Sequence, residues 1–591
     1  MKIRGRLARN AIVVVAIAGV TSFALAGCTT SGTPAPTTAK GGTVTVATVN
    51  DFTSFNQNTP DGNLDTNGFV GYMTTGGFFT VDPKFKVIYD TSFGKLEKTS
   101  DSPLTVKYTL KKGLKWSDGK PITADDMALA WAINTGFYDS GTTDDAGKVT
   151  TGTNYFATAG STAALNGPSF PVISSDDLSM TMKYSDPYVD YAIFSPIAQP
   201  AHVVAEKAGL KSAAELTALL KKLPKGDPAK PAAAADPTLQ KAAEFINRGY
   251  DVTAMPTDKS LLVSSGPMVV SDFVPTQSLT LVKNKFYTGD HASKVDKIVL
   301  RNIPDANAQV SALANGEVDV INPQASADTL TALKATSAKV IIGSQASYDH
   351  LDLSFNAPVF QDLKVRQAFL KTIPRQQILD AIVTPVDAKA KVLNSQQFLP
   401  QVSSYASSVK NNGSSDYAKV DIEGAKTLLA GATPTIKLMY NTNNPNRVDE
   451  FQAIQASATK AGFKIVDAGS PDWSKKLGDG TYDAVMFGWI NPGFGYAGVP
   501  QIWSTNGGGN YNAYKGTNKL ALSTQSILDT KKINPILQDM DKQAFKDAYG
   551  LPLFQLPGIT GVTSRITGVD TYFAGQTGPF WNFWEWTVKG K

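Results

Sequence analysis

The sequence has a single cysteine, Cys28, and only three histidines among its 591 residues. One cysteine cannot form an intramolecular disulfide. The histidines, His202, His291 and His350, are far apart and include no H-x-x-x-H pair, so the sequence offers neither a zinc site nor a cysteine nucleophile with its base. We therefore expect no metal, no cofactor and no catalytic residue. A serine triad would leave no such pattern, because triads assemble in space.

Motifs of phosphate-binding and hydrolytic enzymes are missing as well. The sequence contains no Walker loop and no G-x-S-x-G nucleophile elbow. The triple glycine at 507–509 is not followed by Lys-Ser or Lys-Thr, so it predicts a loop and not a phosphate cradle. We therefore expect that the chain is not an enzyme.

The sequence has little excess of positive over negative charge. The formal net charge is +5, and residues 1–27 contribute four basic residues and no acidic one, which leaves about +1 on the remainder. Without a polybasic surface we expect no nucleic-acid partner. The hydrophobic fraction of 42% and the aromatic fraction of 9% are typical of a globular protein, and the length predicts two or more lobes.

The N-terminus has the pattern of an export signal. Four basic residues precede an apolar run that is too short to cross a membrane comfortably and that ends in Leu25-Ala-Gly-Cys28. This ending resembles the bacterial lipobox, in which the cysteine is acylated and the chain is cut just before it. We expect a signal peptide at 1–27, acylation of Cys28, palmitate included, and a flexible tether at 28–40. Two or three acyl chains would anchor the protein to the outer face of the plasma membrane.

The remaining sequence alternates between strand-like and helix-like segments, which predicts a mixed α/β fold. A Pro- and Ala-rich break inside 212–247 predicts two surface helices joined by a loop. The predicted strands are 43–49, 104–110, 279–282, 297–303, 318–321, 436–440 and 484–489, and the predicted helices are 124–134, 306–314, 363–373, 448–461 and 533–548.

Specific sequence blocks indicate a family. Residues 108–127 read YTLKKGLKWSDGKPITADDM, a strand, two turns and a Thr-capped helix. Further blocks are SGP at 265–267, ALANGEVDV at 312–320, LSFN at 353–356 with VRQA at 365–368, and PLF at 552–554. Together they resemble the family 5 extracellular solute-binding proteins, which include dipeptide, oligopeptide and nickel binders. Turn glycines and amphipathic spacing explain these blocks as scaffold, so they do not locate the ligand.

The resemblance implies a two-lobed, periplasmic-binding-protein-like type II α/β fold with an extra subdomain in the first lobe. Lobe one would comprise 41–303 and 554–591, with the subdomain near 81–175, and lobe two would comprise 304–553. The ligand would lie between the lobes. The implied function is peptide capture for an ABC importer, by a monomer that meets the importer's membrane subunits.

Candidate ligand-binding residues follow strand ends that would face the crevice. Aromatic faces offer apolar contact and asparagines offer hydrogen bonds, although strand-end asparagines can equally be turn residues and aromatics can be core. In the second lobe the candidates are Trp489, Asn491, Phe494, Tyr496, Asn510, Tyr511, Asn441, Asn443 and Arg447. In the first lobe they are Asn50, Phe52 and Phe55.

One departure from the family concerns the ligand's amine. Peptide-binding members commonly carry an acidic residue in the loop after the Trp-containing strand, but residues 491–500 contain none. Asp51, Asp65 or Asp472 would have to reach the cleft instead, since a buried ammonium needs a carboxylate. The acid-poor loop leaves open an oligosaccharide or another polar metabolite as ligand. A non-transport surface receptor or chaperone-like protein also remains open.

Overall fold

The computed structural model describes residues 38–39, 41–143, 149–159, 165, 167–227, 229–230, 235–491, 495–505 and 509–590. Cys28 and the predicted signal peptide lie outside these residues. Strands and helices alternate along the chain, which confirms the predicted mixed α/β class. Within the described ranges, no helix is long and apolar enough to cross a membrane.

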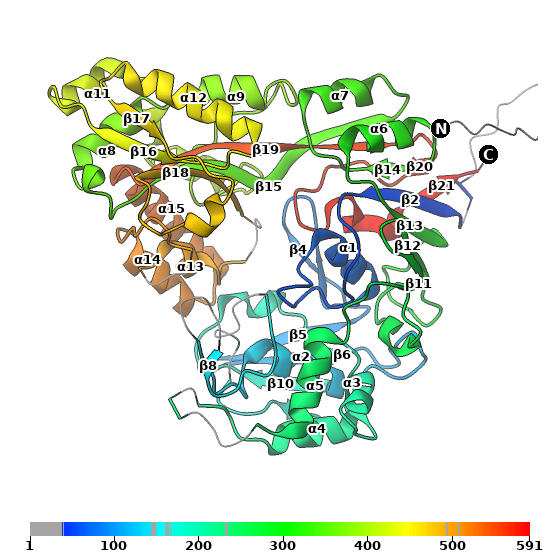
Figure 1. Cartoon of the computed structure of the whole chain (residues 1–591). Coiled ribbons are helices and arrows are strands. Elements are labelled where there is room, and N and C mark those ends of the chain that lie inside the picture. The colour runs from blue at the N-terminus through cyan, green and yellow to red at the C-terminus, as the bar shows by residue number, and fades with distance from the viewer. Residues whose placement is uncertain are drawn as a thin grey trace, which may run out of the picture.

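A ten-stranded sheet runs through the upper part of the molecule (Figure 1). Its parallel pairs are β13·β2, β2·β14, β16·β17 and β16·β18, and the other pairs are antiparallel. In spatial order the strands are β11 (Met268–Val274), β12 (Ser278–Lys283), β13 (Lys297–Asn302), β2 (Thr43–Thr48), β14 (Val320–Ile321), β19 (Gly550–Val562), β15 (Lys339–Leu353), β18 (Ala484–Ile490), β16 (Thr435–Met439) and β17 (Lys464–Asp467).

The two longest strands, β15 and β19, connect the two ends of this sheet. Their first stretch pairs Lys339 to Ser344 with Val562 to Pro557, next to β14. Their second stretch runs from the pair Tyr348–Gln555 to the pair Asp352–Gly550, next to β18. The register shifts between Ser344 and Tyr348, so the pairing is irregular where one half of the sheet passes into the other.

Each half of the sheet has its own hydrophobic core. On one side the core joins β2, β11, β12 and β13 to the aromatic C-terminal segment, with Trp586 fully buried. A smaller cluster lies under α6 (Ala306–Ala314) and α7 (Ala327–Lys334). On the other side Phe369, Phe463 and Phe554 belong to one cluster. The helices contributing to that cluster are α8 (Leu363–Lys371), α9 (Arg375–Ile382), α11 (Ile422–Leu429), α12 (Pro445–Thr459) and α15 (Thr530–Lys546).

A separate subdomain lies below the sheet in Figure 1. Its four-stranded antiparallel sheet has the order β5 (Gly94–Asp101), β6 (Leu104–Leu110), β10 (Ser179–Lys183) and β9 (Val172–Ile173). The helices packed with it are α2 (Ala124–Thr135), α3 (Ala201–Lys207), α4 (Ala213–Lys222) and α5 (Pro237–Arg248). The prediction of two helices within 212–247 is therefore confirmed.

The family-signature segment lies in this subdomain and is structural. Thr123 and Asp126 form a capping box at the start of α2, and the buried Asp126 carboxylate also accepts a hydrogen bond from Trp116 Nε1 at 3.2 Å. The helix ends at Gly136, whose φ of 58° is the left-handed conformation that glycine adopts without strain.

The two chain ends described by the structure meet in a small sheet. β1 (Thr38–Ala39) pairs with β21 (Thr587–Lys589), which pairs with β20 (Ile566–Thr567). The first and the last described segments of the chain therefore lie side by side, at the right of Figure 1.

The subdomain also contacts the half of the molecule that contains β18, through the residues that follow this strand. Asp190, in the 3₁₀ helix η2 (Val189–Ile193), accepts hydrogen bonds from the backbone N–H groups of Tyr496 at 2.8 Å and Ala497 at 2.7 Å. Val189 packs in a cluster with Trp503. Burial raises the pKa of the Asp190 carboxyl, although the two N–H groups offset part of the rise. The half that contains β18 is thus connected to the rest of the molecule in at least two places. One is the pairing of β15 with β19, and another is the contact of Asp190 with Tyr496 and Ala497.

Replacing Asp190 with alanine should open this second contact. The substitution leaves two N–H groups without their charged acceptor, and hydrogen bonds to charged groups contribute about 2 kcal/mol. Small-angle X-ray scattering should show a larger radius of gyration than for the unmodified protein. Asp186→Ala, at an exposed position nearby, is the control and should leave the radius unchanged. An unaltered radius for Asp190→Ala would mean that the packing of Val189 is sufficient.

Candidate ligand-binding site

A cavity of about 750 Å³ lies at the irregular joint between β15 and β19. Gln345, Ala346 and Ser347, the residues skipped by the ladder, form part of its wall, and Gly558 of β19 forms another. Most of the other lining residues come from residues 49–90, the turn at 322–324 and the C-terminal stretch 572–584, and the rest include His291 and Ile490. The cavity is therefore assembled from segments that are distant in the sequence.

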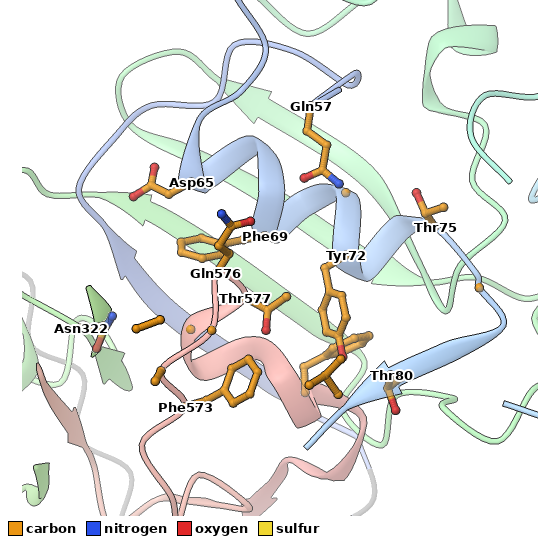
Figure 2. A pocket seen from close by; sticks show the side chains of 18 of the residues that line it. Gln57, Asp65, Phe69, Tyr72, Thr75, Thr80, Asn322, Phe573, Gln576 and Thr577 are labelled. Carbon is orange, nitrogen blue, oxygen red and sulfur yellow. The ribbon is translucent and has the colours of Figure 1, made fainter. Parts of the chain in front are cut away.

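Helix α1 (Asp65–Thr74) presents one face to this cavity. Asp65, Phe69 and Tyr72 are spaced four and three residues apart, so they lie on the same side of the helix. Figure 2 shows these three side chains together with Phe573, Gln576 and Thr577 of the C-terminal stretch. The Tyr72 hydroxyl donates to the Trp581 carbonyl at 2.9 Å, and burial raises its pKa, so Tyr72 is a neutral phenol.

Aromatic side chains make up much of the remaining wall. The ring of Tyr72 lies 6.1 Å from that of Phe583 and 6.4 Å from that of Trp584, measured between centroids. Tyr572 reaches the cavity because Gly343 and Gly558 lie against it: a Cβ at Gly558 would lie 2.0 Å from its hydroxyl. These faces offer apolar contact area with few rotatable bonds.

The cavity wall contains two acidic residues, Asp65 and Asp90, and one histidine, His291, and no lysine or arginine lines it among the described residues. Asp90 is buried and lies 3.1 Å from Nδ1 of His291. Burial alone would raise the pKa of Asp90, but hydrogen bonds from His291 and Ser92 lower it below its ordinary value. Asp90 is therefore ionised and already has its partners within the protein.

Asp65 differs because one of its oxygens is open. Oδ1 accepts hydrogen bonds from Asn50 Nδ2 at 2.9 Å and from the Thr66 N–H at 2.7 Å. Oδ2 has no hydrogen bond or ion pair within the described part of the chain, and the side chain is exposed. The cavity thus offers a carboxylate oxygen to a donor or a cation.

Of the predicted second-lobe aromatics, Trp489, Tyr496 and Tyr511 do not line this cavity. Trp489 is half-buried, and its ring stacks at 9° to Tyr511 and at 4° to His350, with centroids 6.0 and 6.1 Å apart. The next residue, Ile490, does line the cavity. The backbone N–H of Tyr496 is used in the contact with Asp190, and Phe494 lies outside the described residues.

The predicted asparagines of the second lobe take part in local hydrogen bonds. Asn491 Nδ2 donates to the Gln397 carbonyl at 3.2 Å. Asn510 Nδ2 donates to the Ser504 and Tyr514 carbonyls, at 2.9 and 2.8 Å. The side-chain oxygen of Asn441 accepts the N–H of the exposed Asn443 at 3.0 Å, as in an Asx turn.

Arg447 is buried in an ion pair. Its Nε and Nη2 donate to the two carboxylate oxygens of Asp349, at 2.8 and 2.7 Å. An oxygen of Glu450 lies 3.8 Å from Nε, and burial raises the pKa of Glu450 well above its ordinary value. Arg447 is 6% exposed and Asp349 is 2% exposed, so this guanidinium is occupied by the protein itself.

The first-lobe candidates occupy three different environments. Asn50 is exposed and holds Asp65 in place. Phe52 is in the core, with its ring 4.8 Å from Phe55 and 5.5 Å from Phe273. Phe55 is half-buried and lines a second, smaller cavity. Sequence reasoning did name Asp65 as a possible amine partner, but it missed Phe69, Tyr72 and residues 572–584, for which no sequence signal pointed to a ligand.

Replacing Arg447 with methionine tests its structural role. The substitution leaves the buried Asp349 without its cation, which typically costs about 3 kcal/mol or more. The midpoint of thermal unfolding should fall markedly. Arg248→Met is the matched control, because the Arg248 side chain is 68% exposed and its pairing with Asp61 contributes about 1 kcal/mol at most. Equal midpoints for the two variants would contradict the assignment.

Comparison with known proteins identifies relatives among the solute-binding proteins. Residues 94–511 match the family model for the middle region of bacterial extracellular solute-binding proteins, family 5. Oligopeptide-binding protein OppA of Mycobacterium tuberculosis is 23% identical over 510 residues, covering 83% of this chain and 75% of OppA.

Solved structures agree with this match. The periplasmic EDTA-binding protein EppA superposes with a TM-score of 0.76 at 23% identity, covering 94% of this chain and 98% of EppA. The oligopeptide-binding protein AppA from Bacillus subtilis, in complex with a nonapeptide, superposes with a TM-score of 0.63 at 18% identity, covering 94% of this chain and all of AppA. The predicted solute-binding-protein fold is thereby confirmed.

Proposed function

The chain belongs to the bacterial extracellular solute-binding proteins of family 5, and from this we propose that it captures a peptide for an ABC importer. As a member of this family the protein is extracytoplasmic. The peptide would occupy the cavity of about 750 Å³ at the joint between the two halves. Its release to the membrane subunits of the importer would require the halves to separate about that joint.

The observation that carries the peptide assignment is the open carboxylate oxygen of Asp65. A peptide with a free N-terminus brings an ammonium group, and an ammonium that leaves water needs a carboxylate partner. The aromatic walls suit the peptide's apolar side chains. A polyanionic chelate such as EDTA would instead meet two carboxylates, Asp65 and Asp90, with no lysine or arginine in the described lining.

Asp65 also accounts for the acid-free loop at 491–500. Of the three acids considered from the sequence, Asp65 is the one that lines the cavity. Asp51 accepts a hydrogen bond from the Thr276 N–H at 2.7 Å, and Asp472 pairs with Lys475 at 2.8 Å. The ammonium partner in this protein would thus come from α1, across the cavity from β18.

Trp489 and Tyr511 remain candidate contacts for the ligand. They are half-buried and stacked, and the strand that carries Trp489 ends in the cavity-lining Ile490. A peptide longer than the cavity would extend along β18 toward these two rings.

Asp65→Asn should weaken binding of a free-amine peptide and spare its acetylated form. Calorimetry with tetra-alanine should show about a tenfold loss of affinity, because a charge-assisted hydrogen bond becomes neutral. N-acetyl-tetra-alanine should bind both proteins equally. The control is Asp61→Asn, which removes a surface pair with Arg248 outside the lining and should change neither affinity.

Two results would count against this function. Equal losses for the free and acetylated peptides would remove Asp65 as the ammonium partner. Binding of an oligosaccharide by the unmodified protein, with no peptide bound at all, would make the peptide assignment wrong.

We also propose that the protein is held at the membrane by acyl chains on Cys28. The thiol is the only one in the sequence, and it follows Leu-Ala-Gly at the end of an apolar run. Metabolic labelling with a fatty-acid analogue should mark the unmodified protein and not Cys28→Ala, which should still fold because Cys28 precedes the described domain. Equal labelling of both proteins would end the lipoprotein assignment.

A further inference from the structure

A short hairpin lines the cavity of about 750 Å³, called the main cavity here. It consists of β3 (Phe79–Val81) and β4 (Val87–Tyr89), which pair antiparallel. Phe78, just before β3, is 1% exposed and belongs to the core of the subdomain, so the base of the hairpin is fixed there. All three residues of β3 line the main cavity, and Figure 2 shows Thr80 among them.

The loop at the tip of this hairpin turns one aromatic side chain inward. Phe85 is 6% exposed, whereas its neighbours Lys84 and Lys86 are exposed. Asp82 shapes the loop, because its Oδ1 accepts the N–H groups of both lysines, at 2.8 and 2.9 Å. The Asp82 carbonyl accepts the Phe85 N–H at 2.9 Å. The ring of Phe85 is therefore buried while the charged neighbours stay in water.

Phe85 packs in a cluster that joins both halves of the molecule and is called the tip cluster here. The other buried members of this cluster are Ala346, Tyr348, Leu393, Leu399 and Phe573. Leu393 belongs to the half that contains β18, since its N–H donates at 3.0 Å to the carbonyl of Leu553, a residue of that half's core. The ring of Phe573, from the C-terminal stretch, lies 6.1 Å from the ring of Phe85.

The tip cluster lies directly behind the wall of the main cavity. Ala346 and Phe573 belong to the cluster and also line the cavity. Val81 of β3 packs against the cluster and lines the cavity as well. Phe85 is not itself a lining residue. A change at position 85 would therefore act on a ligand through these three residues.

The backbone of Phe85 is strained. Its φ is 59°, in the left-handed region that aromatic residues rarely adopt. Such strain persists only where the surrounding contacts fix it, and it is common at ligand clamps. Here burial of the ring in the tip cluster offsets the strain, so the conformation of the loop depends on contacts between the two halves.

We propose that Phe85 is a positioning residue for peptide capture: packed between the two halves, it holds β3 and Phe573 against the bound peptide and slows the peptide's release. This inference rests on the proposed peptide-binding function. When the halves separate, the tip of the hairpin has to leave Leu393 and Leu399, and apolar surface becomes exposed to water. That exposure is unfavourable and opposes opening.

Stopped-flow tryptophan fluorescence with tetra-alanine tests this role, because Trp489 and Trp581 pack against the tip cluster and Trp584 lines the cavity. Phe85→Ala should raise the dissociation rate about tenfold and change the association rate by less than about threefold. Phe85→Gly relaxes the strain but also removes the ring, so it should release the peptide as fast as Phe85→Ala. Phe85→Leu keeps a large apolar side chain and should restore slow release.

Two controls separate positioning from general destabilisation. Phe451→Ala removes a ring of similar burial, 5% exposed, from the core of the half that contains β18, outside the cavity lining. It should lower the midpoint of thermal unfolding and leave the dissociation rate unchanged. Lys84→Ala removes an exposed side chain of the same loop and should change neither quantity.

Hydrogen exchange of the protein without peptide provides a measurement that does not depend on the ligand. Residues 79–89 should exchange faster in Phe85→Ala than in the unmodified protein, because the hairpin has lost its contact with the other half. The same residues should exchange at the unmodified rate in Phe451→Ala and in Lys84→Ala.

The outcomes distinguish the two proposals. An unchanged dissociation rate or unchanged exchange in Phe85→Ala, or an equally fast release in Phe451→Ala, would overturn the role of Phe85 and leave peptide binding standing. Failure of the unmodified protein to bind tetra-alanine and a pooled tetrapeptide library would overturn the proposed function and this inference with it.

Discussion

The antiparallel pairing of β15 with β19 is the interaction on which the two-part architecture depends. These strands contribute to both halves of the ten-stranded sheet, and their ladder shifts register between Ser344 and Tyr348 and again between Asp349 and His350. An unbroken ladder would have filled the joint with regular backbone. Because residues 345–347 leave the ladder, their side chains and the neighbouring backbone can form the wall of the main cavity. The same irregularity therefore marks the joint between the two halves and lines the cavity that we propose as the binding site.

Two glycines then bring the C-terminal segment to this joint. Side chains at Gly343 and Gly558 would collide with Tyr572, so the absence of a Cβ at both positions lets the aromatic stretch lie against the crossing strands. Phe583 of that stretch also belongs to the core of the half of the sheet that contains β2, and Tyr572 and Trp584 pack against that core. Packing of one lobe and shaping of the cavity are therefore done by the same residues, which couples the stability of that lobe to the geometry of the site.

The sequence predicted the elements with a clear periodicity. The strand prediction 104–110 matches β6, and the helix prediction 306–314 matches α6. The long strands were missed because β19 is buried along nearly its whole length, which removes the alternation that marks a half-exposed strand. Helix α1 was missed because Gly68 and Gly71 lower its helix propensity.

The candidate site could be predicted only in part. The rule that ligand residues follow strand ends identified Trp489, next to the cavity-lining Ile490, but it also selected Arg447. Sequence cannot show that Arg447 faces Asp349, 98 positions away, in the interior. The cavity itself joins residues near 65 to residues near 575, and no local pattern reports such a meeting.

Burial explains why Asp65 keeps an open oxygen whereas the buried aspartates nearby have partners within the protein. Asp349 is 2% exposed and requires Arg447, and Asp190 is 8% exposed and requires two backbone N–H groups. Asp65 sits in the first turn of α1, where the Thr66 N–H donates to its Oδ1 and water can solvate the free Oδ2. A ligand that fills the cavity removes that water. The ligand must then supply a cation or a hydrogen-bond donor to the carboxylate. A ligand that fills the cavity tightly therefore also needs such a group near Asp65.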